Sequence, residues 1–230
     1  MSLIAERLAD VEERIQAAKE RSSYHQEVTL VAVTKFHPLA DMEEAIRCGV
    51  SQVGENRVQE MEGKFRELTL PVTWHLIGHL QKNKVKKAVQ MADLIQSGDS
   101  LDILQEIDRR AGEIGKIQPV LLECNISGEA SKHGIPLADF EAAEAAARKL
   151  PHILVKGLMC MAPLADDEEQ LVRPVFRKGR ALWENMKKRF PEGQISILSM
   201  GMTHDFEIAI EEGATMVRVG TAIFGARTYY

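Results

Sequence analysis

The stretch Val28-Thr29-Leu30-Val31-Ala32-Val33-Thr34-Lys35 is a short apolar run rich in β-branched residues. A run that is apolar at successive positions is typical of a strand buried on both faces of a parallel sheet. Residues 38–48 follow with helical character, and Gly49 ends them. The stretch therefore predicts a strand followed by a helix, which is the repeating unit of an α/β fold.

The same unit recurs along the chain. Strands are predicted to start near Val28, Ser51, Val72, Asp93, Gln118, His152, Ile195 and Thr215. Helices are predicted between them over residues 57–68, 83–91, 101–114, 137–150, 168–190 and 204–212. Eight strands alternating with helices in 230 residues predict a single (β/α)8 TIM barrel domain over residues 1–230. The alternative is an open doubly wound sheet, which needs fewer strands, and no G-x-G-x-x-G follows the first strand.

Residues 1–22 are predicted to form an extra N-terminal helix ahead of the first strand. Ile4, Leu8, Val11 and Ile15 recur at helical spacing, with charged residues between them. The segment contains no uninterrupted apolar stretch of the kind found in an export signal, because Glu6 and other charged residues interrupt it.

Composition narrows the class of protein further. The chain is 45% hydrophobic with a formal net charge of −5, which indicates a globular protein and makes nucleic acid an unexpected partner. No stretch approaches the length of about 20 apolar residues that a membrane helix needs. Cys48, Cys124 and Cys160 are odd in number and never spaced as CxxC, which argues against disulfides and structural zinc. We expect a cytoplasmic protein without a membrane span.

Catalytic and binding residues of a TIM barrel lie at the C-terminal ends of its strands. Lys35 follows the first strand on the same face as Val31 and Val33, and a desolvated lysine there would expose an amine that forms a Schiff base with an aldehyde. A lysine that merely extends into solvent is the simpler alternative. Arg218 lies in the last strand between two valines, and barrel closure brings that strand beside the first.

The loops after the last two strands suggest a phosphate site. Ser199 and Thr203 flank a glycine after the seventh strand, and Gly220-Thr221 follow the eighth. In this fold such loops, with their free backbone N–H groups, commonly bind phosphate. Singly, each residue could equally cap a helix or permit a turn. Together with Lys35 and Arg218, they describe a ligand with an aldehyde, a phosphate and a hydrogen-bond acceptor, a set that pyridoxal 5′-phosphate (PLP) carries.

The sequence also resembles a known family, the pyridoxal phosphate homeostasis proteins. The matching segments are Val31–Lys35 (VAVTK), 54–60 (GENRVQE), 74–84 (WHLIGHLQKNK), 157–159 (GLM), 198–202 (LSMGM) and 217–225 (VRVGTAIFG). The resemblance implies an alanine-racemase-like barrel of PLP fold type III with the cofactor on Lys35 as a Schiff base. It implies cofactor contacts from Lys35, Asn56, Ser199, Arg218, Gly220 and Thr221. We also predict contacts from His79, Met200 and Gly201. One departure from the family pattern is Thr203-His204, where a serine followed by an acid is expected.

Two functions remain open at this point. Arg218 can only donate hydrogen bonds, so it would leave the pyridine nitrogen unprotonated and the ring a weak electron sink. The resemblance implies a carrier and regulator of cellular PLP in vitamin B6 homeostasis, with no catalytic residue and with apo PLP-dependent enzymes as possible recipients. The alternative is an amino-acid racemase that uses Lys35 as a base, with Tyr229 or Tyr230 as the second acid–base group. A Schiff-base aldolase is disfavoured by Arg218. The chain length leaves no room for the second domain of a racemase, so we expect a monomeric carrier.

A histidine pair and a loop lysine also carry chemistry that could serve a site. His75 and His79 have the H-x3-H spacing of zinc ligands, but on a strand these positions lie about 13 Å apart, so we expect no metal site. His79 is predicted at the mouth of the cofactor site, with a structural histidine as an equally good interpretation. Lys132, in a polar loop after the fifth strand, is a candidate second amine for cofactor entry or release, with an ordinary surface lysine as the simpler alternative.

Overall fold

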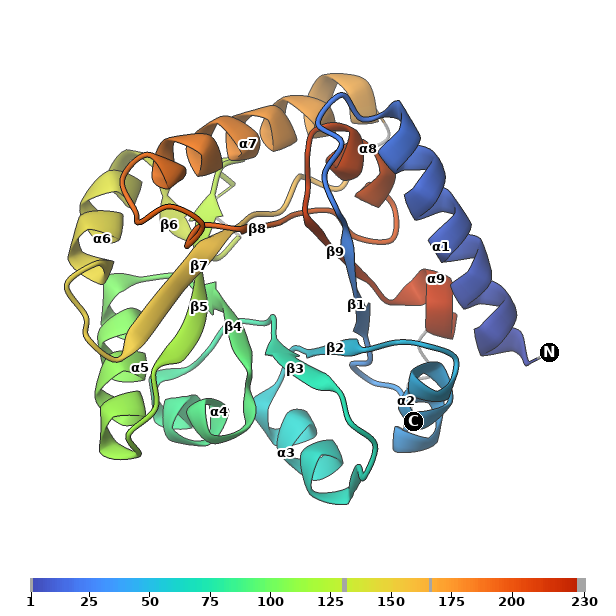
Figure 1. Ribbon diagram of the computed structural model, residues 1–230, viewed down its shortest axis with the longest axis horizontal. Helices are drawn as coiled ribbons and strands as arrows, with labels where there is room; N and C mark the ends of the chain where they lie inside the picture. The colour runs from blue at the N-terminus through green and yellow to red at the C-terminus, as the bar shows by residue number, and fades with distance from the viewer. Residues whose placement is uncertain (1, 130–131, 166, 227–230) are drawn as a thin grey trace.

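The computed structural model describes residues 2–129, 132–165 and 167–226, and it shows a closed barrel of parallel strands (Figure 1). The strands of the barrel are β1 (Thr29–Val33), β2 (Gln52–Glu55), β3 (Thr73–Leu76), β4 (Leu94–Gly98), β5 (Gln118–Asn125), β7 (Ile153–Met159), β8 (Ile197–Ser199) and β9 (Met216–Val219). Each pairs in parallel with the next, β4 pairs with β5, and β9 closes the ring against β1. The predicted (β/α)8 barrel is therefore confirmed.

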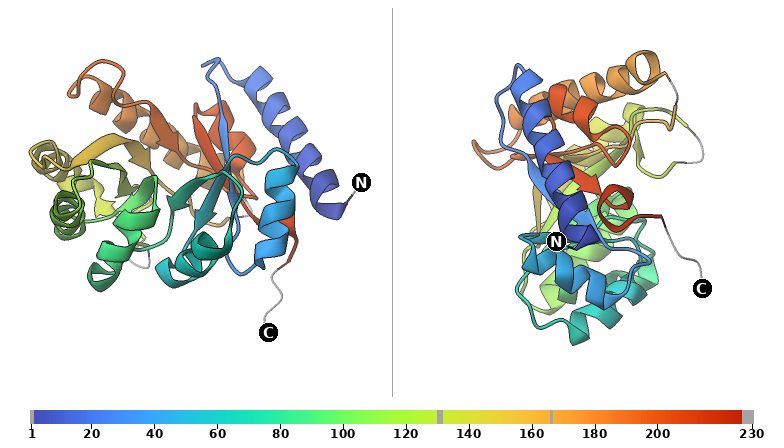
Figure 2. Two further views of the ribbon diagram at one scale, coloured as in Figure 1. Left: turned by 60° about the horizontal axis from the view of Figure 1, so that its bottom comes forward. Right: turned by 90° about the vertical axis from the view of Figure 1, so that its right-hand side faces the viewer.

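Helices surround the barrel on the outside (Figures 1 and 2). They are α1 (Leu3–Arg21), α2 (Leu39–Arg47), α3 (Val58–Glu67), α4 (Val85–Met91), α5 (Leu101–Glu113), α6 (Phe140–Ala147), α7 (Arg173–Lys187), α8 (Phe206–Glu211) and α9 (Thr221–Phe224). Short 3-10 turns precede α4 (Lys82–Lys84) and α6 (Leu137–Asp139). In the described ranges, no helix combines the length and apolar character needed to cross a membrane.

The predicted N-terminal helix is α1, which packs along α8 and α9 (Figure 2). Its first turn is capped by Ser2, whose hydroxyl accepts a hydrogen bond from the backbone N–H of Ala5 at 3.3 Å. Leu8 and Val11 lie on its buried face, as the helical spacing predicts. Burial of this apolar stripe, rather than helix propensity alone, stabilises α1.

Three local features differ from the sequence prediction. The two-residue strand β6 (Ile135–Pro136) pairs with the end of β5 and is too short to be recognised from a pattern. The single helix expected over residues 168–190 begins as a π-helix, Glu168–Val172, before α7. Pro174 lies in the first turn of α7, where a proline is tolerated. The helix expected from residue 204 begins at Phe206, because the Asp205 carboxylate accepts the Met202 N–H in a turn.

Alternation along the strands divides the interior of the barrel from the layer beneath the helices. Val31 packs inside the barrel with Leu121 and Met159, whereas Ala32 belongs to the larger core shared with the helices. The inward face of β1 continues through Val33 to Lys35, as predicted. The interior is partly polar, since Gln96 and Ser199 are fully buried within it.

Candidate functional site

A cavity of about 360 Å³ lies at the C-terminal ends of the strands. It is lined by Val33, Lys35, Asn56, Ile77, Gly78, His79, Glu123, His133, Met161, Met202, Thr203, His204, Arg218, Gly220 and Thr221. A larger cavity of about 630 Å³ opens at the other end of the barrel, where residues such as Thr29, Gln52 and Thr73 begin their strands. We assign the functional site to the smaller cavity, because it contains the amine, the guanidinium and the glycine-containing loops, and because TIM barrels place their chemistry at this end.

The cavity brings together most of the predicted site residues. Lys35, Asn56, His79, Arg218, Gly220 and Thr221 all line it. Ser199 and Met200 are fully buried and do not line it. Gly201, also absent from the lining, has a φ of +93°, and a Cβ there would meet Phe206 and Ala209. The loop after β8 therefore reaches the cavity through Met202, Thr203 and His204.

Asn56 is positioned by a close backbone approach between the ends of β2 and β3. A Cβ on Gly78 would lie only 2.4 Å from the carbonyl oxygen of Asn56. Glycine is required at residue 78 because any side chain would push the two loops apart. Asn56 thereby reaches the same cavity as Lys35.

The loops after β8 and β9 meet directly. The hydroxyl of Thr203 accepts a hydrogen bond from the backbone N–H of Gly220 at 3.4 Å. Gly220 lies close to β1, since a Cβ there would come within 3.1 Å of the Val33 carbonyl oxygen. These contacts set a hydroxyl and the start of α9 beside Lys35. Thr203, which the sequence places in a predicted phosphate loop, therefore lines the cavity with its hydroxyl bonded to Gly220.

Arg218 is 4% exposed and is held by a chain of buried polar groups. Its guanidinium donates to Ser199 Oγ at 2.6 Å and to the carbonyl oxygen of Cys160 at 3.2 Å. Ser199 Oγ in turn lies 2.6 Å from Gln96 Oε1, and Gln96 Nε2 lies 2.9 Å from His75 Nδ1. A buried guanidinium between two valines is costly unless it is paired, and these hydrogen bonds supply the partners.

The hydrogen bonds of this buried chain all run in one direction, from Arg218 to His75. An arginine only donates, so Ser199 accepts from Arg218 and donates its own proton to Gln96 Oε1. The amide nitrogen of Gln96 then donates to His75 Nδ1, which leaves the proton of a neutral His75 on Nε2. Burial lowers the pKa of His75 to about 4, so the ring is neutral near pH 7. Burial also lowers the pKa of Arg218 from its usual value, although an arginine keeps its proton at ordinary pH.

Replacing Ser199 with alanine is expected to destabilise the protein by about 1–3 kcal/mol. The change leaves a guanidinium N–H of Arg218 and the amide oxygen of Gln96 buried without their partner. Urea denaturation at pH 7 measures the free energy of unfolding. Ser196→Ala is the matched control, since Ser196 is exposed and should change stability by less than about 0.5 kcal/mol. Equal, small losses of unfolding free energy in both variants would show that the hydrogen-bond chain from Arg218 to His75 contributes little to stability.

Glu123 lines the cavity from β5 and was not predicted from the sequence. It is only 3% exposed, and burial raises the pKa of its carboxyl to about 7. The negative charge of Asp99 raises this pKa further, whereas Arg218 opposes the shift. The Glu123 carboxyl therefore changes from protonated to ionised as the pH passes through about 7. A sequence signal existed, because a glutamate on the inward face of an apolar strand is rarely buried without a role.

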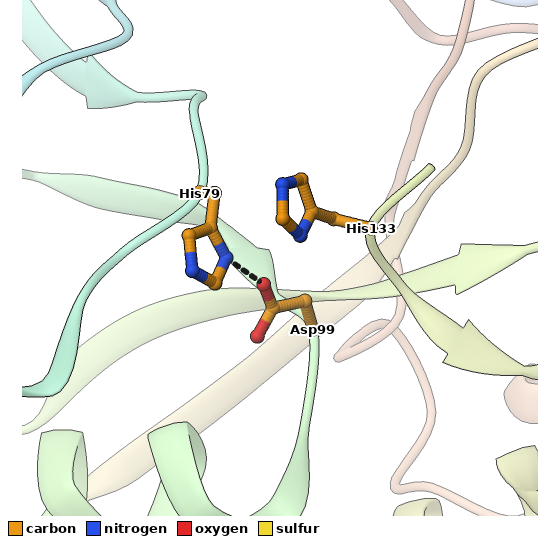
Figure 3. Close-up of side chains that lie close together, drawn as sticks. All are labelled: His79, Asp99 and His133. Atoms are coloured by element: carbon orange, nitrogen blue, oxygen red, sulfur yellow. Dashed lines mark hydrogen bonds and ion pairs between the residues drawn. The ribbon is translucent and has the colours of Figure 1, made fainter. Parts of the chain in front are cut away.

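Asp99 and two histidines form a cluster at the edge of the cavity (Figure 3). His79 Nδ1 lies 2.5 Å from Asp99 Oδ2, and the rings of His79 and His133 stack with centroids 4.0 Å apart and planes 10° apart. One ligand atom from each residue lies within 4.8 Å of the others, so the residue types would suit a metal ion. However, the lone pair of each imidazole nitrogen lies in the plane of its ring, and these two ring planes are stacked nearly parallel. The two lone pairs therefore do not converge on one point, as binding of a single metal ion requires. We assign no metal to the cluster.

The remaining sequence candidates are placed as follows. His75 lines the cavity at the opposite end of the barrel from His79, so the two do not face a common site. Lys132 Nζ donates to Glu129 Oε1 at 2.6 Å and to the carbonyl oxygen of Ala162 at 2.9 Å, and it does not line the cavity. Tyr229 and Tyr230, the candidate second groups of a racemase, lie outside the described residues.

Comparison with known proteins defines the class. The family "Alanine racemase, N-terminal domain" matches residues 7–228. The chain is 42% identical over 226 residues to a pyridoxal phosphate homeostasis protein of Aquifex aeolicus, covering 97% of this chain and 98% of that protein. It is 41% identical over 235 residues to the protein of the same name from Escherichia coli, covering 100% of this chain and 99% of the relative.

Solved structures agree with these matches. PipY of Synechococcus elongatus, solved with PLP bound, superposes with a TM-score of 0.84 at 36% identity, covering 96% of this chain and 100% of PipY. Alanine racemase from Streptomyces coelicolor gives a TM-score of 0.76 at 19% identity over 97% of this chain and 58% of the racemase, a likeness of fold alone. The chain belongs to the alanine racemase N-terminal domain family and, within it, to the pyridoxal phosphate homeostasis proteins.

Proposed function

We propose that this protein binds PLP at the C-terminal end of the barrel and acts as a carrier and regulator of the cofactor. The observation that carries the proposal is the convergence of Lys35, Arg218 and the Thr203–Gly220 contact on one cavity. The relatives near 40% identity are named pyridoxal phosphate homeostasis proteins, and the related PipY was solved with PLP.

The groups that line the cavity fit this cofactor. A volume of about 360 Å³ is within the range of about 300–1,000 Å³ that is usual for small-molecule sites. Lys35 supplies an amine, and Arg218 supplies donors for an unprotonated ring nitrogen. Thr203, Gly220 and Thr221 supply hydroxyl and backbone donors for a phosphate. Asn56 and His79 follow β2 and β3, which lie on the other side of β1 from Arg218 on β9. They complete the wall of the cavity.

The predicted phosphate contact of Ser199 takes a different form in this proposal. Its hydroxyl is already bonded to Arg218 and Gln96 beneath the cavity. We therefore propose Thr203, four residues later, as the hydroxyl that contacts the phosphate. Ser199 acts by holding Arg218. Met200 and Gly201 shape the turn that carries Thr203 to the cavity.

When bound, PLP would supply an aldehyde, and Lys35 would hold the cofactor covalently through its amine. Arg218 keeps its own proton and would leave the pyridine nitrogen of bound PLP without one, so the cavity residues would hold the cofactor without strengthening it as an electron sink. The proposal therefore includes little or no catalytic turnover. It also includes a monomeric, cytoplasmic protein that releases PLP to apo-enzymes.

Borohydride trapping tests this function. The purified protein is incubated with PLP, its visible spectrum is recorded, and the linkage is reduced and located by peptide mass spectrometry. We expect a visible absorption band and a pyridoxyl group on Lys35. A protein that takes up no PLP, or carries it on another lysine alone, would contradict the proposal. Chiral analysis of alanine after prolonged incubation of the loaded protein then tests the racemase alternative, and we expect no racemisation.

A further inference from the structure

A buried lysine lies directly behind Lys35, outside the cavity. Lys64 is on α3, and its side chain is only 9% exposed. Its Nζ donates to Glu55 Oε1 at 2.7 Å, to Glu60 Oε1 at 2.9 Å and to the carbonyl oxygen of Thr34 at 2.7 Å. An ammonium group has three N–H donors, and three oxygens receive them. Lys64, Glu55 and Glu60 form what we call the rear cluster.

The rear cluster bonds to the residue on each side of Lys35. Before it, Thr34 is held through its carbonyl oxygen by Lys64 and through its hydroxyl, which donates to Glu55 Oε1 at 2.5 Å. After it, the backbone N–H of Phe36 donates to Glu60 Oε1 at 2.6 Å. The residues on both sides of Lys35 are therefore held by the same cluster of three charged side chains.

The backbone after Lys35 is in a conformation that needs support. Phe36 has a φ of +64°, in the left-handed region that costs energy for any residue with a Cβ. Phe36 is 38% exposed, so burial of this residue does not by itself account for its backbone conformation. The hydrogen bond from its N–H to Glu60 is a direct restraint that favours it. Strained backbone beside a functional group is a known sign of preorganisation.

The composition of the rear cluster argues for a geometric role. Burying an ammonium and carboxylates costs desolvation energy that their attraction only partly offsets, so such a cluster is a poor means of gaining stability. Burial raises the pKa of Glu55, and the interactions with Lys64 and Thr34 oppose this shift without cancelling it. No member of the cluster lines the cavity, so any effect on a ligand must pass through the backbone around Lys35.

We propose that Lys64, Glu60 and Glu55 are positioning residues that aim the Lys35 amine into the cavity. This inference rests on the proposed function, because it concerns the same amine and the same cofactor. Loss of the cluster frees the backbone around Phe36, and the amine then spends less time in the orientation that reacts with an aldehyde. The non-covalent contacts of the cavity are unchanged.

Two ligands separate positioning from general damage. PLP reports covalent capture by Lys35, followed through the rate at which its visible band forms. Pyridoxine 5′-phosphate has an alcohol in place of the aldehyde, so its affinity reports only the non-covalent site. The variants are Lys64→Met and Glu60→Ala, which remove the bonds, and Glu60→Gln, which keeps an oxygen that accepts from Phe36. Lys86→Met is the control, since Lys86 is exposed on α4.

We expect Lys64→Met and Glu60→Ala to slow PLP capture by about tenfold, with the affinity for pyridoxine 5′-phosphate within about twofold of the parent protein. Glu60→Gln and Lys86→Met should capture PLP at close to the parent rate. Unchanged capture in Glu60→Ala, or equal losses for both ligands, would overturn the positioning role. Should Lys64→Met fail to fold, the Glu60 pair decides alone. A parent protein that captures no PLP on Lys35 would instead overturn the proposed function itself.

Discussion

Lys35→Ala is expected to lose the visible absorption band of the PLP-loaded protein and to weaken PLP retention by at least about a hundredfold, equivalent to about 2.8 kcal/mol. The substitution removes the amine that forms the covalent bond and leaves the other wall residues in place. Equilibrium dialysis against PLP measures the affinity, and the spectrum reports the linkage. Binding of pyridoxine 5′-phosphate should be far less affected, because that ligand forms no Schiff base.

Two further variants make this result specific to the amine. Lys35→Arg keeps a positive charge but cannot form the linkage under these conditions, so it should lose the band as completely as the alanine variant. Lys86→Ala removes an exposed lysine and should leave both band and affinity unchanged. A borohydride-stable adduct that persists in Lys35→Ala would show that another lysine carries the cofactor.

Glu123→Gln is expected to stabilise the apo-protein at pH 8 by about 3 kcal/mol and to leave its stability at pH 4.5 nearly unchanged. In the unfolded chain this carboxyl ionises near its usual pKa of 4.5, whereas in the folded protein its pKa is about 7. Between those values the folded protein holds a proton that the unfolded chain has released. The contribution of Glu123 to stability is therefore greatest at low pH and is lost as the pH rises to about 7.

Urea denaturation of the parent and the variant at several pH values between 4.5 and 8 checks this expectation. The difference between the two proteins isolates Glu123 from other groups that titrate in the same range. Glu12→Gln, on the exposed face of α1, is the control and should shift stability by less than about 0.5 kcal/mol throughout. A constant difference between the parent and Glu123→Gln over this range would contradict a raised pKa for this carboxyl.

The fold and the positions of Lys35 and Arg218 could be predicted from the sequence, because they depend on local patterns. Periodic apolar runs located the strands, and strand order in a closed barrel placed Arg218 beside β1, where it pairs in register with Val31. Alternation along β1 then carried Lys35 to the inner face. These inferences need only the chain direction and the geometry of a parallel barrel.

The remaining features depend on contacts between distant residues. Which hydroxyl reaches the cavity, Ser199 or Thr203, is decided by the left-handed turn at Gly201 and by the buried partner Gln96, 103 residues away from Ser199. Lys64 has the sequence context of an exposed helix residue, but its partner Thr34 is 30 residues earlier in the chain. No local pattern contains that information. Glu123 was overlooked although alternation along β5 was sufficient to place it inside the barrel.

The hydrogen-bond chain from Arg218 to His75 has a consequence for anyone who wishes to transplant this site. Each of these side chains donates one hydrogen bond or accepts one from its neighbour. Replacing a donor by an acceptor, or the reverse, would leave two buried groups unpaired. Arg218, Ser199, Gln96 and His75 would therefore have to be engineered together. Grafting Arg218 alone into another barrel would introduce a buried charge without its hydrogen-bond partners.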